Sequence, residues 1–220
     1  MISPPPPPDD SSTDLALLHR AQLGEFAAFE ELVTRLQPRV YRLARRMLGE
    51  SHDAEDVTQQ TFLSLVEHLD GFRGESSVVT WVLRIAANHA LKLLRKRRGL
   101  PTVPLAEADD GYADLPHPQS IAPWRDDPAD LAGRHETRRL IDRALTDLDD
   151  KYRAVFVLRD VEGFSVKETA DLLGISEANV KVRLLRARLA LREKLTATFG
   201  DEAARVRPHS HHLLAPEGGS

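Results

Sequence analysis

The apolar residues of this 220-residue chain recur at alternating intervals of three and four, the spacing that places side chains on one face of a helix. The clearest run consists of Phe26, Phe29, Val33, Leu36, Val40, Leu43 and Met47. It predicts one long amphipathic helix. Pro38 should kink or divide this helix, because proline removes a backbone donor and crowds the preceding turn.

Two further helices are predicted before residue 100. Gly49 is suited to end the first helix and Ser51 to cap the next, whose opening turn carries acids near the positive end of its dipole. The buried stripe of this second helix should consist of Val57, Phe62, Leu65, Val66 and Leu69. A third helix over 80–98 should bury Trp81, Val82, Ile85, Ala86, His89, Leu93 and Leu94 before the following glycine and proline stop it.

The helical pattern then breaks and resumes. Residues 99–127 hold five prolines among acids without sustained periodicity, which is typical of a linker and predicts one over 99–128. Helical spacing returns with Leu131, Leu140, Ile141, Leu145, Leu148, Tyr152, Val155, Phe156 and Leu158. We therefore predict an all-α protein of two small helical domains, residues 14–98 and 129–197, joined by an extended acidic linker. Residues 1–13, rich in proline, and residues 198–220 should form flexible tails.

The net charge of −4 hides two basic segments. Residues 84–98 hold six basic side chains and no acidic one, and residues 177–194 hold six against two acids. The acids gather in residues 50–75 and 107–130 instead. Because DNA attracts local basic surfaces through counterion release, this separation keeps nucleic acid open as a partner despite the negative total.

Several other classes of protein are disfavoured. The chain has no cysteine, which excludes disulfides, thiol nucleophiles and cysteine zinc sites, and no run approaches eighteen apolar residues. Prolines 4–8 stand where a secretory signal would need apolar residues, so we expect a cytoplasmic protein without membrane insertion. His209, His211 and His212 have no partner carboxylate in a defined element and predict no metal site. No catalytic grouping predicts an enzyme, a cofactor or a small-molecule substrate.

The C-terminal segment carries the pattern of a helix-turn-helix. Ser165 and Glu168 have the spacing of a capping box, and Gly174 can adopt the left-handed turn between two helices. Ser176 can cap a second helix that runs from Glu177 to about residue 195. On that helix Lys181, Arg183, Arg186 and Arg188 can extend toward solvent or phosphate. The alternative is a helical hairpin with a solvated basic face.

The N-terminal segment over 70–98 combines a polar, glycine-containing loop with a basic helix. Asn88 and Lys92 lie one turn apart on this helix, just after the loop that begins at Phe72. Such a loop can hold a displaced base against an aromatic ring while basic side chains follow single-stranded DNA. Taken alone, the segment favours the alternative, an ordinary loop followed by a solvated basic helix end.

Together these motifs resemble the extracytoplasmic-function class of the sigma-70 family of bacterial sigma factors, from about residue 15 to residue 195. The resemblance is carried by the strings over residues 53–62 (DAEDVTQQTF), 72–76 (FRGES), 80–88 (TWVLRIAAN) and 163–174 (GFSVKETADLLG), with Val180-Lys181-Val182-Arg183 after them. It implies a factor that binds core RNA polymerase, directs it to specific promoters and helps to open the DNA. Such a factor typically acts in a stress or envelope response under an anti-sigma protein, near the nucleoid when active and held at the membrane when inhibited.

The resemblance also assigns surfaces. It implies docking on the beta-prime clamp helices of the polymerase through Asp53, Glu55, Asp56, Gln59, Gln60 and Phe62. Single-stranded minus-ten DNA would meet Phe72, Arg73, Gly74, Glu75, Ser76, Ser77, Asn88, Lys92 and Arg95. Duplex minus-thirty-five DNA would meet Glu177, Ala178, Asn179, Lys181, Val182, Arg183, Leu185 and Arg186, while the second domain sits on the beta flap. The linker acids would either occupy a channel built for RNA or only keep the linker extended.

Two other functions remain open from the residues alone. A stand-alone regulator would bind duplex operators through residues 165–195 and would do so without polymerase, in most cases as a dimer. An adaptor that binds polymerase without touching DNA would keep its promoter choice when Arg183 or Arg186 is replaced.

Overall fold

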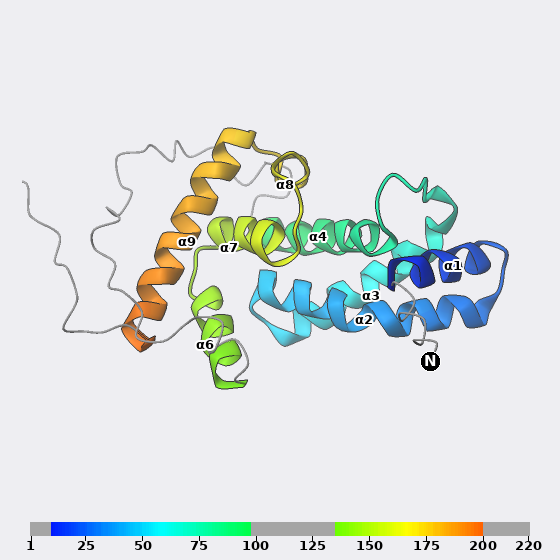
Figure 1. Ribbon diagram of the computed structural model, residues 1–220, viewed down its shortest axis with the longest axis horizontal. Helices are drawn as coiled ribbons and strands as arrows, with labels where there is room; N and C mark the ends of the chain where they lie inside the picture. The colour runs from blue at the N-terminus through cyan, green and yellow to red at the C-terminus, as the bar shows by residue number, and fades with distance from the viewer. Residues whose placement is uncertain (1–9, 98–134, 200–220) are drawn as a thin grey trace, which may run out of the picture.

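The computed structural model describes residues 10–97 and 135–199, and every regular element within these ranges is helical (Figure 1). The first half contains α1 (Asp10–Gln22), α2 (Phe26–Leu48), α3 (Ser51–Glu67), a 3-10 turn (Leu69–Gly71) and α4 (Val78–Arg97). The second half contains α6 (His135–Thr146), α7 (Asp150–Phe156), a π-helical turn (Val157–Val161), α8 (Val166–Leu173) and α9 (Glu177–Phe199). None of these helices is long and apolar enough to cross a membrane. The all-α prediction is confirmed for the described residues.

The predicted tails and linker are only partly visible in the structure. Residues 10–13 already belong to α1, so the tail predicted over 1–13 is too long, and α9 reaches Phe199 rather than ending at about residue 195. The predicted linker over 99–128, with its acids and prolines, lies outside the described residues, as do Leu131 and the three histidines after residue 208.

Helix α2 is the centre of the first half and contacts α1, α3 and α4. Its buried stripe follows the predicted spacing through Leu36, Val40, Leu43 and Met47, each at most 4% exposed. The prediction is wrong for Phe26, which is 75% exposed because it starts the helix at the outer end of the bundle (Figure 1).

Pro38 does not divide α2, which is continuous from Phe26 to Leu48, so the predicted join is wrong. The ring is exposed, and Leu36 and Val40 on either side of it are buried in the core. Packing of this stripe offsets the lost backbone hydrogen bond.

The junction between α2 and α3 was predicted in part. Gly49 has a left-handed φ of 80° and donates its N–H to the Arg45 carbonyl at 3.0 Å, which confirms it as the end of α2. Ser51 is the first residue of α3, and Glu50 occupies the N-cap position without a side-chain bond, so the predicted serine cap is wrong by one residue. Val66 is 56% exposed, because it lies on the outer face of α3 away from Thr61 and Leu65.

The second half packs α6, α7 and α8 against α9, which lies steeply inclined to α2 and α4 at the end of the molecule opposite α1 (Figure 1). Val180, Leu184, Ala187 and Leu191 form the buried stripe of α9, each at most 7% exposed. Their spacing of three and four residues repeats the pattern that defines α2.

The two halves are in direct contact along a surface that we call the domain seam, where α2 meets α6 and α7, and α4 meets α8. One continuous apolar core crosses the seam and joins residues of α2 and α4 to Val155, Leu158, Phe164 and Leu173. Ion pairs at the edge of the seam join Arg46 to Asp142 at 3.4 Å, Arg39 to Glu162 at 3.2 Å, and Arg84 to Glu168. The halves therefore form one packed unit in this structure.

Arg153 of α7 is the buried polar element of the seam and is 5% exposed. Its Nε donates to the Met47 carbonyl of α2 at 3.0 Å, and its Nη1 donates to the Thr146 carbonyl at 2.8 Å and the Leu148 carbonyl at 3.4 Å. Asp150 pairs with the same guanidinium. Because the last carbonyls of a helix lack intrahelical donors, Arg153 satisfies the ends of α2 and α6 together. Sequence reasoning missed this residue, which has no motif around it.

Candidate nucleic-acid interface

The loop predicted to meet melted DNA lies between α3 and α4 and exposes most of its side chains. Arg73, Gly74, Glu75 and Ser77 are exposed, whereas Phe72 and Ser76 are half-buried. Gly74 has a φ of 73°, a backbone conformation that would be strained for a residue with a side chain. Ser77 accepts the Thr80 N–H at 3.1 Å and so caps α4. The loop is thus anchored at the start of α4.

An aromatic pair lies at the base of this loop. The rings of Phe72 and Trp81 are 5.2 Å apart at an angle of 57°. Such a tilted pair is a stable arrangement, and an aromatic ring at the edge of a loop provides a surface on which a nucleobase can stack.

A hollow of about 420 Å³ lies beside the pair, between α3 and α4. It is lined by Ser64, His68, Gly71, Trp81, Ile85, Asn88 and His89. The structure thus brings the predicted Asn88 to the hollow behind the loop, with its side chain exposed. The lining combines apolar rings with groups that donate and accept hydrogen bonds, which suits a planar base displaced from its stack.

His89, predicted as a packed side chain, is half-buried in this hollow. Its Nε2 lies 3.0 Å from the Ser64 hydroxyl. Burial lowers the pKa of His89, and the neighbouring Lys92 charge lowers it further. The imidazole is therefore neutral at physiological pH and offers both a donor and an acceptor. Sequence reasoning did not place Ser64 or His89 beside Asn88.

The basic end of α4 is divided between solvent and internal contacts. Lys92 is exposed, and Arg95 is half-buried with its Nε shielded from water. Arg97 pairs with Asp53 and donates to the Leu48 carbonyl at 3.2 Å. Of the predicted residues here, Lys92 is thus the one with its charge in solvent.

The face of α3 predicted to bind polymerase is mostly exposed. Glu55, Asp56, Gln59 and Gln60 are exposed and Phe62 is half-buried, whereas Asp53 is held by its ion pair with Arg97. Glu55 and Gln59 line a hollow of about 510 Å³ with Thr58 and with Gln37, Pro38 and Tyr41 of α2.

Leu63 and Val66 add an apolar surface to α3, at 57% and 56% exposure, that sequence reasoning missed. Val66 was missed because the sequence analysis assigned it to the buried stripe of this helix. Their spacing, three residues apart on the outer face, is the signal that could have found them.

The helix-turn-helix prediction is confirmed in its local geometry. Glu168 N–H donates to the Ser165 hydroxyl at 3.1 Å, and the Glu168 carboxylate accepts the Ser165 N–H at 2.7 Å, which completes the capping box. Gly174 has a φ of 67°. Ser176 accepts the Asn179 N–H at 3.2 Å and caps α9. Two helices joined by this turn present the start of α9 in the manner of a recognition helix.

The predicted contact residues on α9 do not share one environment. Glu177, Ala178, Lys181 and Leu185 are exposed, the last at 44%, and Asn179 is half-buried. Arg186 is also half-buried and donates to the Tyr152 hydroxyl at 3.1 Å.

Val182 and Arg183 are buried, at 9% and 0% exposure, so the expectation that Arg183 extends to solvent is wrong for this structure. Arg183 follows Val180 by three residues and precedes Ala187 by four, which places it in the buried stripe. Arg188 is exposed, as expected, and its side chain makes two hydrogen bonds of 2.8 Å with Asp160. The exposed part of the predicted surface is therefore the first turns of α9.

Comparison with known proteins follows the division into two halves. The family model described as "Sigma-70 region 2" matches residues 32–99, and the one described as "Sigma-70, region 4" matches residues 138–191. The chain is 34% identical over 179 residues to "ECF RNA polymerase sigma factor SigM" of Mycobacterium tuberculosis, covering 81% of this chain and 83% of the relative. It is 32% identical over 178 residues to "ECF RNA polymerase sigma factor SigW" of Bacillus subtilis, covering 81% and 94%.

A solved structure is similar in fold. It is entitled "Structure of CnrH in complex with the cytosolic domain of CnrY", with 28% identity and a TM-score of 0.52 over 84% of this chain and 98% of the other. The likeness extends over both matched regions.

Proposed function

Because the chain belongs to the extracytoplasmic-function sigma factors of the sigma-70 family, we propose how its surfaces divide the work of promoter recognition. As a sigma factor it binds core RNA polymerase, directs it to specific promoters and acts under anti-sigma control. Sigma factors are transcription initiation factors rather than enzymes. Its place of action is the cytoplasm, with the nucleoid when active and the membrane when an anti-sigma protein holds it.

The first half, residues 14–98, provides the contacts with melted minus-ten DNA. The observation that carries this assignment is the hollow of about 420 Å³ behind the exposed loop, with Trp81 and Asn88 in its lining. A base that leaves the stack can bury its ring there while its edge pairs with the Asn88 amide. Lys92 lies one turn further along α4 and can meet the backbone phosphates.

The outer face of α3 provides the contact with polymerase. Exposed Glu55, Asp56, Gln59 and Gln60 lie on the same helix as exposed Leu63 and Val66. An apolar patch with an acidic and amide rim is the usual composition of a protein interface. The clamp helices of the beta-prime subunit are the partner that the sigma family implies.

The second half, residues 129–197, provides the contact with duplex minus-thirty-five DNA through the start of α9, and it meets the beta flap. Minus ten and minus thirty-five lie 25 base pairs apart, or roughly 85 Å at 3.4 Å per base pair. The closed domain seam keeps the two halves together, so they must separate when both elements are bound. At up to about 3.3 Å per residue, the segment over 99–128 can cover roughly 100 Å, which is sufficient.

Transcription in vitro with purified core polymerase tests this division. Phe72→Ala should reduce open-complex formation, because the loop loses its aromatic ring, while Phe26→Ala removes a more exposed phenylalanine, at the start of α2 and outside the loop, and should have no effect. Glu55→Lys with Asp56→Lys should weaken polymerase binding, and Glu30→Lys with Glu31→Lys on α2 is its matched control. Core enzyme that starts at the same sites with and without this chain would contradict the proposal.

A stand-alone regulator predicts a different result in a gel shift. It would bind promoter duplex specifically without polymerase. The sigma assignment predicts weak binding by the chain alone and strong, sequence-specific binding by the holoenzyme.

A further inference from the structure

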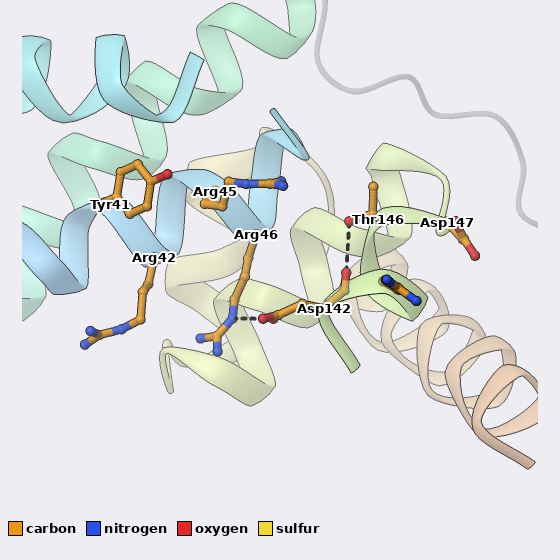
Figure 2. A pocket seen from close by; sticks show the side chains of 8 residues that line it. Tyr41, Arg42, Arg45, Arg46, Asp142, Thr146 and Asp147 are labelled. Atoms are coloured by element: carbon orange, nitrogen blue, oxygen red, sulfur yellow. Dashed lines mark hydrogen bonds and ion pairs between the residues drawn. The ribbon is translucent and has the colours of Figure 1, made fainter. Parts of the chain in front are cut away.

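A second hollow, of about 570 Å³, lies on the domain seam between α2 and α6 (Figure 2). It is lined by Tyr41, Arg42, Arg45 and Arg46 of α2, by Asp142, Arg143 and Thr146 of α6, and by Asp147. Four arginines and two aspartates give the lining a formal charge of +2. None of these residues belongs to the surfaces assigned above to DNA, and only Tyr41 also lines the hollow beside α3.

Both acids of this pocket are already paired. Asp142 meets Arg46 at 3.4 Å across the seam, and Asp147 meets Lys194 of α9 at 3.2 Å. Figure 2 shows Asp147 turned away from α2, while Arg46 points toward Asp142. The carboxylates therefore do not neutralise the remaining guanidinium groups.

Ordinary helix electrostatics accounts for only part of the basic lining. Arg45 and Arg46 lie in the last turn of α2, where a cation is favoured by the helix dipole, and Arg45 also bonds to the Gly49 carbonyl. Arg143 likewise lies in the last turn of α6, whereas Arg42 lies one turn before the end of α2 and has no such role. Both are exposed, and within residues 10–97 and 135–199 neither side chain forms an ion pair or a hydrogen bond.

The geometry points to a site for a small polyanion. We propose that the pocket between α2 and α6 binds a small molecule carrying two or more linked phosphates, held by Arg42 from one half and Arg143 from the other. The guanidinium group is suited to this ligand because its planar donors form paired hydrogen bonds with phosphate oxygens. The volume lies within the range of small-molecule sites, and the half-buried Tyr41 offers a ring beside the phosphates.

A ligand held in this way bridges the two halves. Its phosphates bind most tightly when α2 and α6 are adjacent, so binding favours the closed seam over the separated form. By the same linkage, separation of the two halves lowers the affinity of the pocket for the ligand. A phosphorylated metabolite would thereby oppose the separation that simultaneous contact with both promoter elements requires.

Calorimetric titration of the full chain, without polymerase, tests the site directly. The probes are inorganic tripolyphosphate and ATP, each compared with sulfate at matched ionic strength because simple screening affects all three alike. Both probes should bind with 1:1 stoichiometry and more tightly than sulfate. If ATP binds about tenfold more tightly than tripolyphosphate, the ligand is a nucleotide that also uses Tyr41; similar affinities show recognition of the phosphate chain alone.

Matched variants locate the site. Arg42→Gln and Arg143→Gln should each lower affinity about tenfold, since each removes a charge-assisted contact, and the two exposed side chains can change without loss of fold. Arg192→Gln removes an exposed arginine of α9 outside the pocket and should leave the affinity unchanged. Probe affinity equal to that of sulfate, or an effect of Arg42→Gln without one of Arg143→Gln, would overturn the proposal of a bridging site.

Discussion

Arg84 of α4 and Glu168 of α8 form an ion pair although they are 84 positions apart, and the same glutamate closes the capping box of the helix-turn-helix. One Glu168 oxygen accepts the Ser165 N–H at 2.7 Å and the other meets Arg84. A single carboxylate therefore links the start of α8 to the half of the protein that carries the proposed minus-ten loop. Local helix capping and closure of the domain seam depend on the same side chain.

Replacement of the two partners should separate these roles. Glu168→Ala loses the carboxylate half of the capping box and the ion pair, and should lower the free energy of unfolding by about 1–2 kcal/mol, while the Ser165 hydroxyl still accepts the backbone N–H of residue 168. Arg84→Ala leaves the capping box intact and loses a pair that is about one-third exposed, so the cost should be below about 1 kcal/mol. Urea unfolding followed by circular dichroism measures both. Equal losses in the two variants would show that the cap contributes nothing.

The same glutamate gives a pH dependence. Hydrogen bonds with Ser165 are the main cause that lowers the pKa of Glu168, and Arg84 adds to the effect. A carboxyl whose pKa is lowered by folding stabilises the protein fully above its ordinary pKa, and this contribution is lost as pH falls through the lowered value. The stability difference between the natural chain and Glu168→Gln should therefore shrink as the pH falls below the ordinary carboxyl pKa of 4.5. A difference that stays constant over unfolding curves in this range would contradict the assignment.

Local features were predictable from the sequence because their causes are local. The caps at Ser165, Gly174 and Ser176 depend on residues within one turn, and the α2 stripe depends on helical spacing. The environment of Arg183 was not predictable, because the identity of a basic residue on a recognition helix does not show whether its side chain faces DNA or the protein core. The pairing of Arg84 with Glu168 across the seam was also not predictable, because an ion pair between residues 84 positions apart leaves no local pattern in the sequence.

Arg153 should be the most sensitive polar residue of the seam. Arg153→Met leaves the carbonyls of Met47, Thr146 and Leu148 without their donor in a buried place, and each such loss costs about 1–3 kcal/mol unless water enters. We expect a fall of about 3–5 kcal/mol in the free energy of unfolding. Lysine should not restore it, because an ammonium group cannot reproduce the guanidinium fork. Thermal unfolding of Arg153→Lys tests this, and near-natural stability would show that a point charge is sufficient.

Asn88 should set base preference within the minus-ten element. Its amide is exposed beside the hollow that holds Trp81 and His89, so Asn88→Ala should relax selection at one base position, by about 1–3 kcal/mol if the contact is bidentate. Transcription from a library of minus-ten sequences with core polymerase measures this. Lys92→Ala is the comparison, because loss of a phosphate contact should weaken all sequences alike. Identical sequence profiles for Asn88→Ala and the natural chain would remove Asn88 from the site.

Replacement of Lys181 and of Arg183, two basic residues of α9, should have different effects on stability and on DNA binding. Lys181 is exposed on the first turns of α9, so Lys181→Ala should leave stability within about 0.5 kcal/mol and weaken binding to minus-thirty-five duplex in the holoenzyme. Arg183 is fully buried, and Arg183→Ala should cost about 3–5 kcal/mol of stability, because a buried interaction loses one partner. Thermal unfolding and promoter binding by the holoenzyme, measured on the same two variants, separate the effects. If Arg183→Ala kept its melting temperature and lost only minus-thirty-five contacts, Arg183 would be a contact residue that becomes exposed when the halves separate.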